Sequence, residues 1–459
     1  MEEKIKIDWS PIIYNEEAIK KAASKGNVVL MVTLATKPCF YKLWSIIQEA
    51  KKNNLPYLIL HTGQHYDDLV GHGIKEMQFD IAIDLQIRGD LSQKTAELSL
   101  KIKNLATYLS KKYPDKEFVP YANGDTLAAA MVPAAWMFAT NKKAIHGEAG
   151  LRGMAPNYFH ELKESISPED LVQKEFSLEW SVLRNEPFPE QWDTFVAGAA
   201  SQFHFAPVKL NAAHLMREGY PTDTIFQVGN TVVDVIELKK KLQPEESIFN
   251  LYPKLENDEW LRVDIHRRGN LTEKRFKAII GTVQNLVKQG KNVCFIELNA
   301  TKKALEYFNL RKKLQDLENN KNFLFTPLWK EYAHVIEFLE SKNCWAILTD
   351  SGSMQEEMNE LQKPCFTTRF NTDRPETVMF ANSNLLVPPI SSDFMTKVMQ
   401  YCQETMQDQM KNKDKLYGHN VADKITTQIK KLFEDPQLFR WAHEELKLYK
   451  EDKNGLKSL

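Results

Sequence analysis

Cysteine is scarce in this chain, and its distribution argues against a metal or disulfide framework. The 459 residues contain five cysteines, with no Cys-x-x-Cys pair and no histidine beside them at metal-ligand spacing. Structural zinc needs closely spaced Cys or His ligands, and disulfides belong to oxidising compartments. We therefore expect no structural zinc, a reducing cytoplasmic environment and mostly buried thiols. The five residues are Cys39, Cys294, Cys344, Cys365 and Cys402.

Long apolar runs and a strong excess of charge are also missing. No run approaches the ~20 apolar residues of a membrane span. The first ten residues, MEEKIKIDWS, do not show the basic and then apolar pattern of a secretory signal. The formal net charge is -1, which by itself indicates neither a nucleic-acid partner nor a membrane partner. The 43% hydrophobic and 26% charged content is ordinary for a soluble globular protein, and the length suits two domains with additions.

Short apolar runs alternate with amphipathic stretches through most of the chain. This alternation predicts two parallel sheets covered by helices, one before about residue 228 and one after it. We expect two doubly wound α/β domains with a cleft between them, and ligands at the carboxyl ends of the strands. The predicted strands are 28–34, 57–61, 118–122, 260–265, 292–298, 322–326 and 345–349. The predicted helices are 43–52, 91–111, 127–140, 272–289 and 331–341.

The most informative segment reads Asp-Ser-Gly-Ser-Met-Gln-Glu-Glu at 350–357 and follows the apolar run 344–348. Small residues at a strand-to-helix junction let backbone N–H groups approach an anion, and the helix N-terminus adds positive potential. Glu357 would lie one turn beyond Ser353, where it could accept hydrogen bonds from ribose hydroxyls. The pattern is typical of nucleoside diphosphate binding, although an ordinary Ser-capped helix would look the same.

Short polar clusters follow several predicted strands, and each also has an ordinary structural interpretation. Asp125 could belong to a turn, Glu148 to a surface ion pair, and Glu190 to a helix first turn. His266 could be a strand-end histidine, and Lys37 and Lys42 could be surface lysines. Six clusters at strand ends in both halves would instead suit proton transfer combined with stabilisation of a leaving group. The clusters lie at 61–67, 123–126, 146–152, 187–190, 266–268 and 369–376.

Taken in order, these segments resemble the UDP-N-acetylglucosamine 2-epimerase family, non-hydrolysing type, over roughly residues 28–434. The markers include Thr-Gly-Gln-His-Tyr-Asp at 62–67, Gly-Asp-Thr at 124–126, His-Gly-Glu-Ala-Gly-Leu-Arg at 146–152, Pro-Phe-Pro-Glu at 187–190, Val-Gly-Asn-Thr-Val-Val-Asp at 228–234, His-Arg-Arg at 266–268, the 350–357 segment, Asp-Arg-Pro-Glu at 373–376 and Tyr-Gly at 417–418. The resemblance implies a GT-B fold of two Rossmann-like domains.

The resemblance also implies a domain plan. A first Rossmann-like domain would span 27–228, and a UDP-binding second one 229–415. We expect three additions: an N-terminal extension at 1–26, a polar and partly helical insertion at 153–186, and C-terminal helices at 416–459 that pack back on the first domain. The charged tail 435–459 could pack one helical face through Phe439, Trp441, Leu446 and Tyr449.

The implied reaction interconverts UDP-N-acetylglucosamine and UDP-N-acetylmannosamine. UDP leaves as the C2 proton is removed, a 2-acetamidoglucal forms, and UDP adds again after protonation of the other face. No metal or nicotinamide cofactor is implied. By resemblance the catalytic residues are Asp125, Glu148, Glu190 and His266, with the base and the acid unassigned. The substrate and UDP ligands would be Lys37, Lys42, Gln64, His65, Arg152, Arg267, Ser351, Gly352, Ser353, Glu357 and Arg374.

The chain departs from the family pattern at several phosphate and regulatory positions. The usual Gly-Thr-Arg-Pro-Glu is Ala-Thr-Lys-Pro-Cys at 35–39, so lysine replaces a bidentate arginine and Cys39 replaces a glutamate. Thr194 replaces an arginine, and Ser353 replaces a glycine. Glu297 replaces a histidine that belongs, in bacterial members, to a second, activating substrate site, where a carboxylate would repel a UDP-sugar.

These departures leave three other interpretations open. A hydrolysing relative would release N-acetylmannosamine and UDP. A GT-B glycosyltransferase would use the same diphosphate site but would not need Asp125, Glu148 and Glu190 together. A catalytically silent UDP-sugar-binding protein is the third. Family members are often dimers, so we expect a homodimer whose product feeds polysaccharide biosynthesis.

Overall fold

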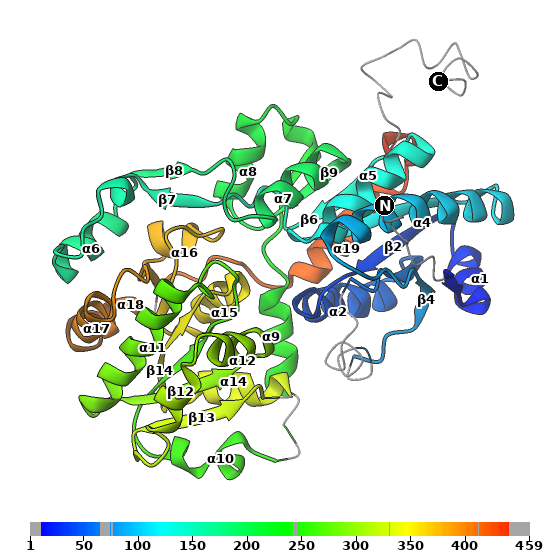
Figure 1. The fold of residues 1–459 in the computed structure, drawn as a ribbon. Coiled ribbons are helices and arrows are strands. Elements are labelled where there is room, and N and C mark those ends of the chain that lie inside the picture. Colours follow the sequence, from blue (N-terminus) through cyan, green and yellow to red (C-terminus); the bar gives the residue numbers. More distant parts are fainter. Residues whose placement is uncertain are drawn as a thin grey trace, which may run out of the picture. The chain divides into compact units, whose positions relative to one another are not determined.

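The computed structural model describes residues 11–64, 74, 77–241, 244, 246–329, 331–411 and 413–439. The chain divides into two compact units. Unit 1 comprises Met1–Leu151, Phe188–Val235 and His419–Leu459, and unit 2 comprises Arg152–Pro187 and Ile236–Gly418. Each unit holds one large sheet whose strands alternate with helices along the chain (Figure 1). The expected α/β class with two doubly wound units is confirmed.

The sheet of unit 1 has the order β1-β4-β3-β2-β5-β6-β9-β10. Its pairs are parallel except for β1, which runs antiparallel to β4 at the edge. The central strand β2 is buried along its whole length, as the uninterrupted apolar run 28–34 predicts. The strands are β1 (Ile13–Tyr14), β2 (Val28–Leu34), β3 (Tyr57–His61), β4 (Ile81–Asp84), β5 (Glu117–Asn123), β6 (Ala144–Gly147), β9 (Ser201–Ala206) and β10 (Ile225–Gln227).

Helices close the core of unit 1. Apolar side chains of α1, α4 and α5 form one cluster with β2, β3 and β4. Helix α7 packs on α5, and the C-terminal helix α19 packs on α2. The helices are α1 (Glu16–Ser24), α2 (Lys37–Lys52), α4 (Leu91–Lys112), α5 (Leu127–Thr140), α7 (Glu190–Ala199), α8 (Lys209–Arg217) and α19 (Val421–Leu432). Helix α9 (Val232–Lys241) begins in unit 1 and continues into unit 2 at Ile236.

The sheet of unit 2 has the order β13-β12-β11-β14-β15-β16, and all of its strands are parallel. Side chains of α6, α11 and α17 pack against one face, whereas α10 and α14 pack against the other. The strands are β11 (Trp260–Asp264), β12 (Asn292–Glu297), β13 (Phe323–Pro327), β14 (Cys344–Thr349), β15 (Cys365–Thr367) and β16 (Asn384–Leu386). The helices include α10 (Ile248–Leu251), α11 (Glu273–Lys288), α12 (Asn299–Tyr307), α14 (Tyr332–Glu340), α15 (Gly352–Leu361), α16 (Glu376–Met379) and α17 (Ser392–Tyr401).

The segment expected as an insertion belongs to unit 2. It forms an antiparallel pair, β7 (Met154–Pro156) with β8 (Trp180–Val182), and the helix α6 (Pro168–Glu175) (Figure 1). Leu171 and Val172 of α6 enter the unit 2 core. The buried Glu175 carboxylate accepts a hydrogen bond from the Leu386 backbone N–H at 2.6 Å. The segment is therefore a packed part of unit 2 rather than a loose polar loop.

Two differences from the sequence prediction are larger than a one-residue shift of an element end. Helix α2 begins at Lys37 instead of residue 43, because Pro38 suits the first turn of a helix. The extension before residue 27 contains its own strand β1 and helix α1, so β2 is not the first strand. In the predicted tail, Phe439 is buried and its ring centre lies 5.2 Å from that of Phe203, whereas Trp441, Leu446 and Tyr449 lie outside the described residues.

All five cysteines are buried free thiols, as expected. Among the residues that the structure describes, no helix has both the length and the apolar character to cross a membrane.

Candidate active site

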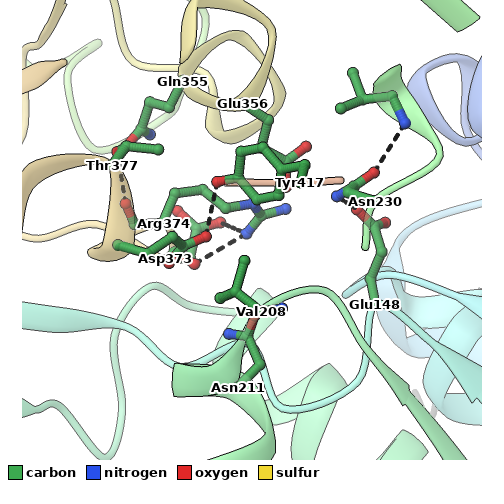
Figure 2. Close-up of polar contacts among 12 residues, drawn as sticks. Glu148, Val208, Asn211, Asn230, Gln355, Glu356, Asp373, Arg374, Thr377 and Tyr417 are labelled. Carbon is green, nitrogen blue, oxygen red and sulfur yellow. Dashed lines mark hydrogen bonds and ion pairs between the residues drawn. The ribbon is translucent and has the colours of Figure 1, made fainter. Parts of the chain in front are cut away.

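Glu148, which follows β6, is the most tightly held carboxylate of unit 1. It is buried and forms an ion pair with Lys42 of α2. One oxygen also accepts a hydrogen bond from the side-chain amide of Asn123 at 2.7 Å. The other accepts from the side-chain amide of Asn230 at 2.6 Å (Figure 2). Hydrogen bonds from a cation and two amides are what a fixed, ionised carboxylate requires inside a protein. Three separate parts of unit 1 therefore converge on one side chain.

The backbone around Glu148 is unusual. Its φ of 56° lies in the left-handed region, which non-glycine residues rarely occupy and which tends to occur at functional sites. Gly150 allows the tight turn that follows, because a Cβ there would lie 2.2 Å from the Asn211 carbonyl oxygen. The Gly150 carbonyl accepts hydrogen bonds from Asn211 Nδ2 at 3.3 Å and faces His214 Nδ1 at 3.1 Å. These contacts hold the loop in a conformation that sequence pattern alone does not indicate.

The other two predicted carboxylates begin neighbouring helices. Asp125 directly precedes the N-cap of α5, where the Thr126 hydroxyl accepts from the Ala129 N–H at 3.2 Å. Glu190 is the first residue of α7, and both carboxylates are partly buried. Because α7 packs on α5, the two helix starts belong to one polar region of unit 1.

Asp193, one turn beyond Glu190 on α7, was given no role from the sequence. Its side chain is only 1% exposed. Burial and then the negative charges of Asp125 and Glu190 raise the pKa of Asp193 to about 8. Residues three apart on a helix lie on the same face, so a helix that starts at Glu190 would place Glu190 and Asp193 on one face.

The other described ligands predicted in the first 152 residues lie at helix starts, in a buried ion pair and at the first position of unit 2. Lys37 is the first residue of α2, and Lys42, predicted to face a diphosphate, is paired with Glu148. The side-chain oxygen of Gln64 accepts from the Ala128 N–H at 3.0 Å, which places it at the start of α5. Arg152 is buried at the first position of unit 2. His65 lies outside the described residues.

In unit 2, Asp350 organises the turn that carries His266. The fully buried Asp350 carboxylate accepts from the backbone N–H groups of His266 and Arg267, each at 3.0 Å, and from Asn270 Nδ2 at 3.0 Å. His266 Nδ1 lies 3.2 Å from Asp350 Oδ1, and the histidine side chain remains 43% exposed. A buried carboxylate therefore orients an accessible imidazole, an arrangement that the sequence did not reveal because 84 residues separate the two.

The predicted anion-binding segment forms the expected strand-to-helix junction. β14 ends at Thr349, and α15 begins at Gly352 with Ser351 as its N-cap residue. Within the part of the chain that the structure describes, the Ser351 side chain makes no capping hydrogen bond, so it does not occupy the helix N-terminus. Ser353 is partly buried in the first turn, and Glu357 is buried one turn later, as predicted.

A buried cluster of charges supports this junction. Asp373 accepts from Arg369 at 2.7 Å and from Arg374 at 3.1 Å, and Arg267 Nη2 lies 3.5 Å away. Although burial opposes ionisation, the positive charges of Arg369, Arg267 and Arg374 hold the pKa of Asp373 well below its usual range. Arg374, predicted as a substrate ligand, is 3% exposed and pairs with both Glu356 and Asp373 (Figure 2).

Three positions that depart from the family pattern are buried or paired in the structure. The Cys39 thiol is buried, which raises its pKa to about 11, so it stays neutral where a glutamate is usual. Thr194 is buried on α7. Glu297 accepts from both Nη atoms of Arg311, at 2.5 and 3.3 Å, so this carboxylate is paired within unit 2.

Comparison with known proteins gives a consistent assignment. The family model described as UDP-N-acetylglucosamine 2-epimerase matches residues 181–430. A UDP-N-acetylglucosamine 2-epimerase of Methanocaldococcus jannaschii is 29% identical over 78% of this chain and 88% of its own length. A UDP-N-acetylglucosamine 2-epimerase of Methanococcus maripaludis is 27% identical over 87% of this chain and 97% of its own length.

A solved structure supports the same relationship. The M. jannaschii UDP-GlcNAc 2-epimerase, in complex with UDP-GlcNAc and UDP, is 27% identical to this chain with a TM-score of 0.70. The match covers 88% of this chain and 99% of that one. The family model matches more than half of the chain, and the two sheets follow the GT-B plan of its structural relatives. The chain therefore belongs to the UDP-N-acetylglucosamine 2-epimerase family of enzymes.

Proposed function

We propose that this protein interconverts UDP-N-acetylglucosamine and UDP-N-acetylmannosamine through a 2-acetamidoglucal. A carboxylate removes the C2 proton, the C1=C2 double bond forms, and the C1–O electron pair leaves with UDP. A carboxylic acid then returns a proton to the opposite face of C2, and a UDP oxygen attacks C1. The reaction is balanced without any external oxidant or reductant. Its substrate class and the family relationship agree with the UDP-GlcNAc and UDP bound to the relative from M. jannaschii.

The observation that carries this proposal is the set of carboxyl groups in unit 1. Removing a weakly acidic C2 proton and replacing it on the other face requires at least two positioned proton carriers. Glu148 is fixed by Lys42, Asn123 and Asn230, and Asp125 and Glu190 start the adjacent helices α5 and α7. A glycosyltransferase that leaves C2 untouched has no need for three such groups.

The groups of unit 2 suit the departure of UDP. The developing negative charge on the diphosphate requires positive groups and N–H donors that are already in position. We assign His266, held by Asp350, and Arg267, beside Asp373, to the leaving phosphate. The N-terminus of α15, with Ser351, Gly352 and Ser353, would bind the diphosphate. Glu357, buried one turn along, would bind the ribose. Lys37 and Lys42 would add positive charge, with Lys42 also holding Glu148.

Nuclear magnetic resonance in D2O tests the reaction. The protein is incubated with UDP-N-acetylglucosamine, and the sugar is followed over time. Deuterium at C2 within intact UDP-sugar of both configurations is the expected result. Free N-acetylmannosamine with UDP would instead identify a hydrolysing enzyme. Absence of C2 exchange and of product would contradict both, and sugar transfer to an added acceptor without C2 exchange would identify a glycosyltransferase.

We also infer that the enzyme works in the cytoplasm as a homodimer. Free thiols at all five cysteines fit a reducing compartment. The dimer rests on the family resemblance, and a sedimentation mass of one chain at micromolar concentration would contradict it.

A further inference from the structure

A buried acid on α7 has no place in the reaction described above. Asp193 lies on the inner face of α7, three residues after Glu190, and is 1% exposed. Among the residues that the structure describes, its buried Oδ1 atom has no hydrogen-bond partner. Leaving a buried carboxyl oxygen unpaired costs free energy, so a native site that keeps one usually uses it.

Among the described residues, the charged groups that shift the pKa of Asp193 are acids. Glu190 shares its helix, and Asp125 precedes α5, on which α7 packs. Helix α5 itself carries no titratable side chain. Strand β9, which also contacts α7, contributes His204, whose ring centre lies 4.5 Å from that of Tyr220. The carboxyls of Asp125 and Glu190 are thus the groups that act most strongly on Asp193, apart from burial itself.

Like charges that share a buried region cannot all ionise together at neutral pH. Burial and the two neighbouring acids raise the pKa of Asp193 to about 8. Its side chain is therefore a neutral carboxylic acid at pH 7. A neutral acid carries an O–H donor, which an ionised aspartate lacks.

We propose that Asp193 is a positioning residue for the C2 proton transfer. As a neutral acid it adds no negative charge next to Asp125 and Glu190 and supplies a hydrogen-bond donor there. Loss of its proton adds a negative charge to the region. That charge opposes both the binding of an anionic UDP-sugar and the charge that develops as C2 loses its proton. The role rests on the function proposed above.

The test uses the pH dependence of C2 deuterium exchange between about pH 6 and pH 10. If only the protonated form of Asp193 supports transfer, the wild-type rate falls about tenfold for each pH unit above about 8. The Asp193→Asn variant has a neutral amide at every pH and cannot lose a proton there. The exchange rate at about pH 9.5 divided by the rate at pH 7 should be more than about tenfold larger for this variant than for the wild type.

Glu175→Gln is the matched control. Glu175 is also a buried acid whose pKa burial raises well above its usual value, but it lies in unit 2 on α6. This variant should keep the alkaline decline of the wild type. A decline that persists unchanged in Asp193→Asn, or that disappears in Glu175→Gln, would overturn the role of Asp193.

Infrared difference spectroscopy gives a readout that does not depend on activity. The C=O stretch of a protonated carboxylic acid should be lost between about pH 7 and pH 9 in the wild type. Burial also raises the pKa of Glu376 to about 7, so this carboxyl contributes to the loss in both proteins. The loss should be smaller in Asp193→Asn than in the wild type, and an equal loss in both would overturn the assignment. Absence of C2 exchange at every pH in the wild type would overturn the proposed function itself. Exchange with an unaltered pH profile in the variant would overturn the Asp193 role alone.

Discussion

Glu148 takes its donors from three stretches of unit 1 that are distant in sequence. Lys42 lies on α2, Asn123 ends β5, and Asn230 precedes α9. A carboxylate with this many donors keeps its position while protons move near it, which is the physical requirement for a catalytic group. The same contacts explain why a buried charge is tolerated at this position.

Replacing Glu148 by glutamine tests its role at the residue scale. The amide is close in size but cannot accept the C2 proton, so C2 exchange should fall by about 10³-fold or more. UDP affinity should change by less than about threefold, because the α15 junction, His266 and Arg267 lie in unit 2 and the positive charge of Lys42 is kept. Exchange rates from nuclear magnetic resonance and affinities from calorimetry measure the two effects.

Glu97→Gln is the control for this prediction. Glu97 forms the other buried Lys–Glu pair that the structure shows in unit 1, with Lys101 at 2.9 Å, on α4. Both substitutions leave a buried lysine without its carboxylate, and each should lower the free energy of unfolding by about 1–3 kcal/mol. Only Glu148→Gln should abolish exchange. Equal rates for the two variants would contradict the assignment of Glu148.

Residue types at strand ends made part of the site predictable. Asp125, Glu148 and His266 stand directly after apolar strand runs, so the sequence alone could locate them. Asp193 and Asp350 could not be assigned in the same way. Their roles depend on packing between α7 and α5 and on a contact across 84 residues, which no local pattern contains.

At the scale of elements, the start of α15 links sequence and structure most directly. The sequence at 344–357 predicts a strand, then small residues, then a helix. The structure adds the neighbours: a Cβ at Gly352 would lie 3.0 Å from Asp373 Oδ2 and 3.6 Å from Arg267 Nη2. The glycine therefore leaves room for the Asp373 carboxylate beside the helix start, and a side chain there would force that carboxylate to shift.

Gly352→Ala should weaken UDP binding by about tenfold, or about 1.4 kcal/mol, because the added methyl crowds the Asp373 carboxylate, beside which Arg267 lies. Isothermal titration calorimetry with UDP measures the change. Gly290→Ala is the comparison, since nothing lies within 4 Å of a Cβ there although its φ is +80°. That variant should lose about 1 kcal/mol of stability and keep its UDP affinity. Unchanged affinity in Gly352→Ala would contradict the proposed diphosphate site.

The composition of the predicted insertion at 153–186 does not indicate how this segment packs. Its polar sequence indicated an addition with some helix, yet Leu171 and Val172 bury themselves in unit 2 and Glu175 receives the Leu386 N–H. Two apolar residues and one buried acid in a polar stretch do not reveal which core they join. That choice depends on the shape of the surface they meet.

Over the whole molecule, the two units carry different chemistry. Unit 1 holds Asp125, Glu148 and Glu190, whereas unit 2 holds His266 and the α15 junction. Each unit has its own sheet and apolar core. Binding of UDP and transfer of the C2 proton should therefore be separable properties.

Hydrogen–deuterium exchange with mass spectrometry measures this separation. UDP alone should slow amide exchange at 266–271 and 352–355 in unit 2, because those amides lie beside the proposed phosphate groups. Amides at 147–151 in unit 1 should change by less than about twofold with UDP and slow further with UDP-N-acetylglucosamine. Protection by UDP that appears in unit 1 but not at 352–355 would contradict the division of roles.

The sequence by itself determined the α/β class, the strands β2, β3, β5, β11, β12, β13 and β14, and the strand-end positions of the main acids. These features follow from local periodicity and from residue types at the ends of apolar runs. Only the tertiary structure decided that Lys42 holds Glu148, that Asp350 orients His266, and that Asp193 is buried beside two other acids. The reason is physical: hydrogen bonds, burial and charge interactions join residues that are distant along the chain, and their strength depends on surroundings that no short segment specifies.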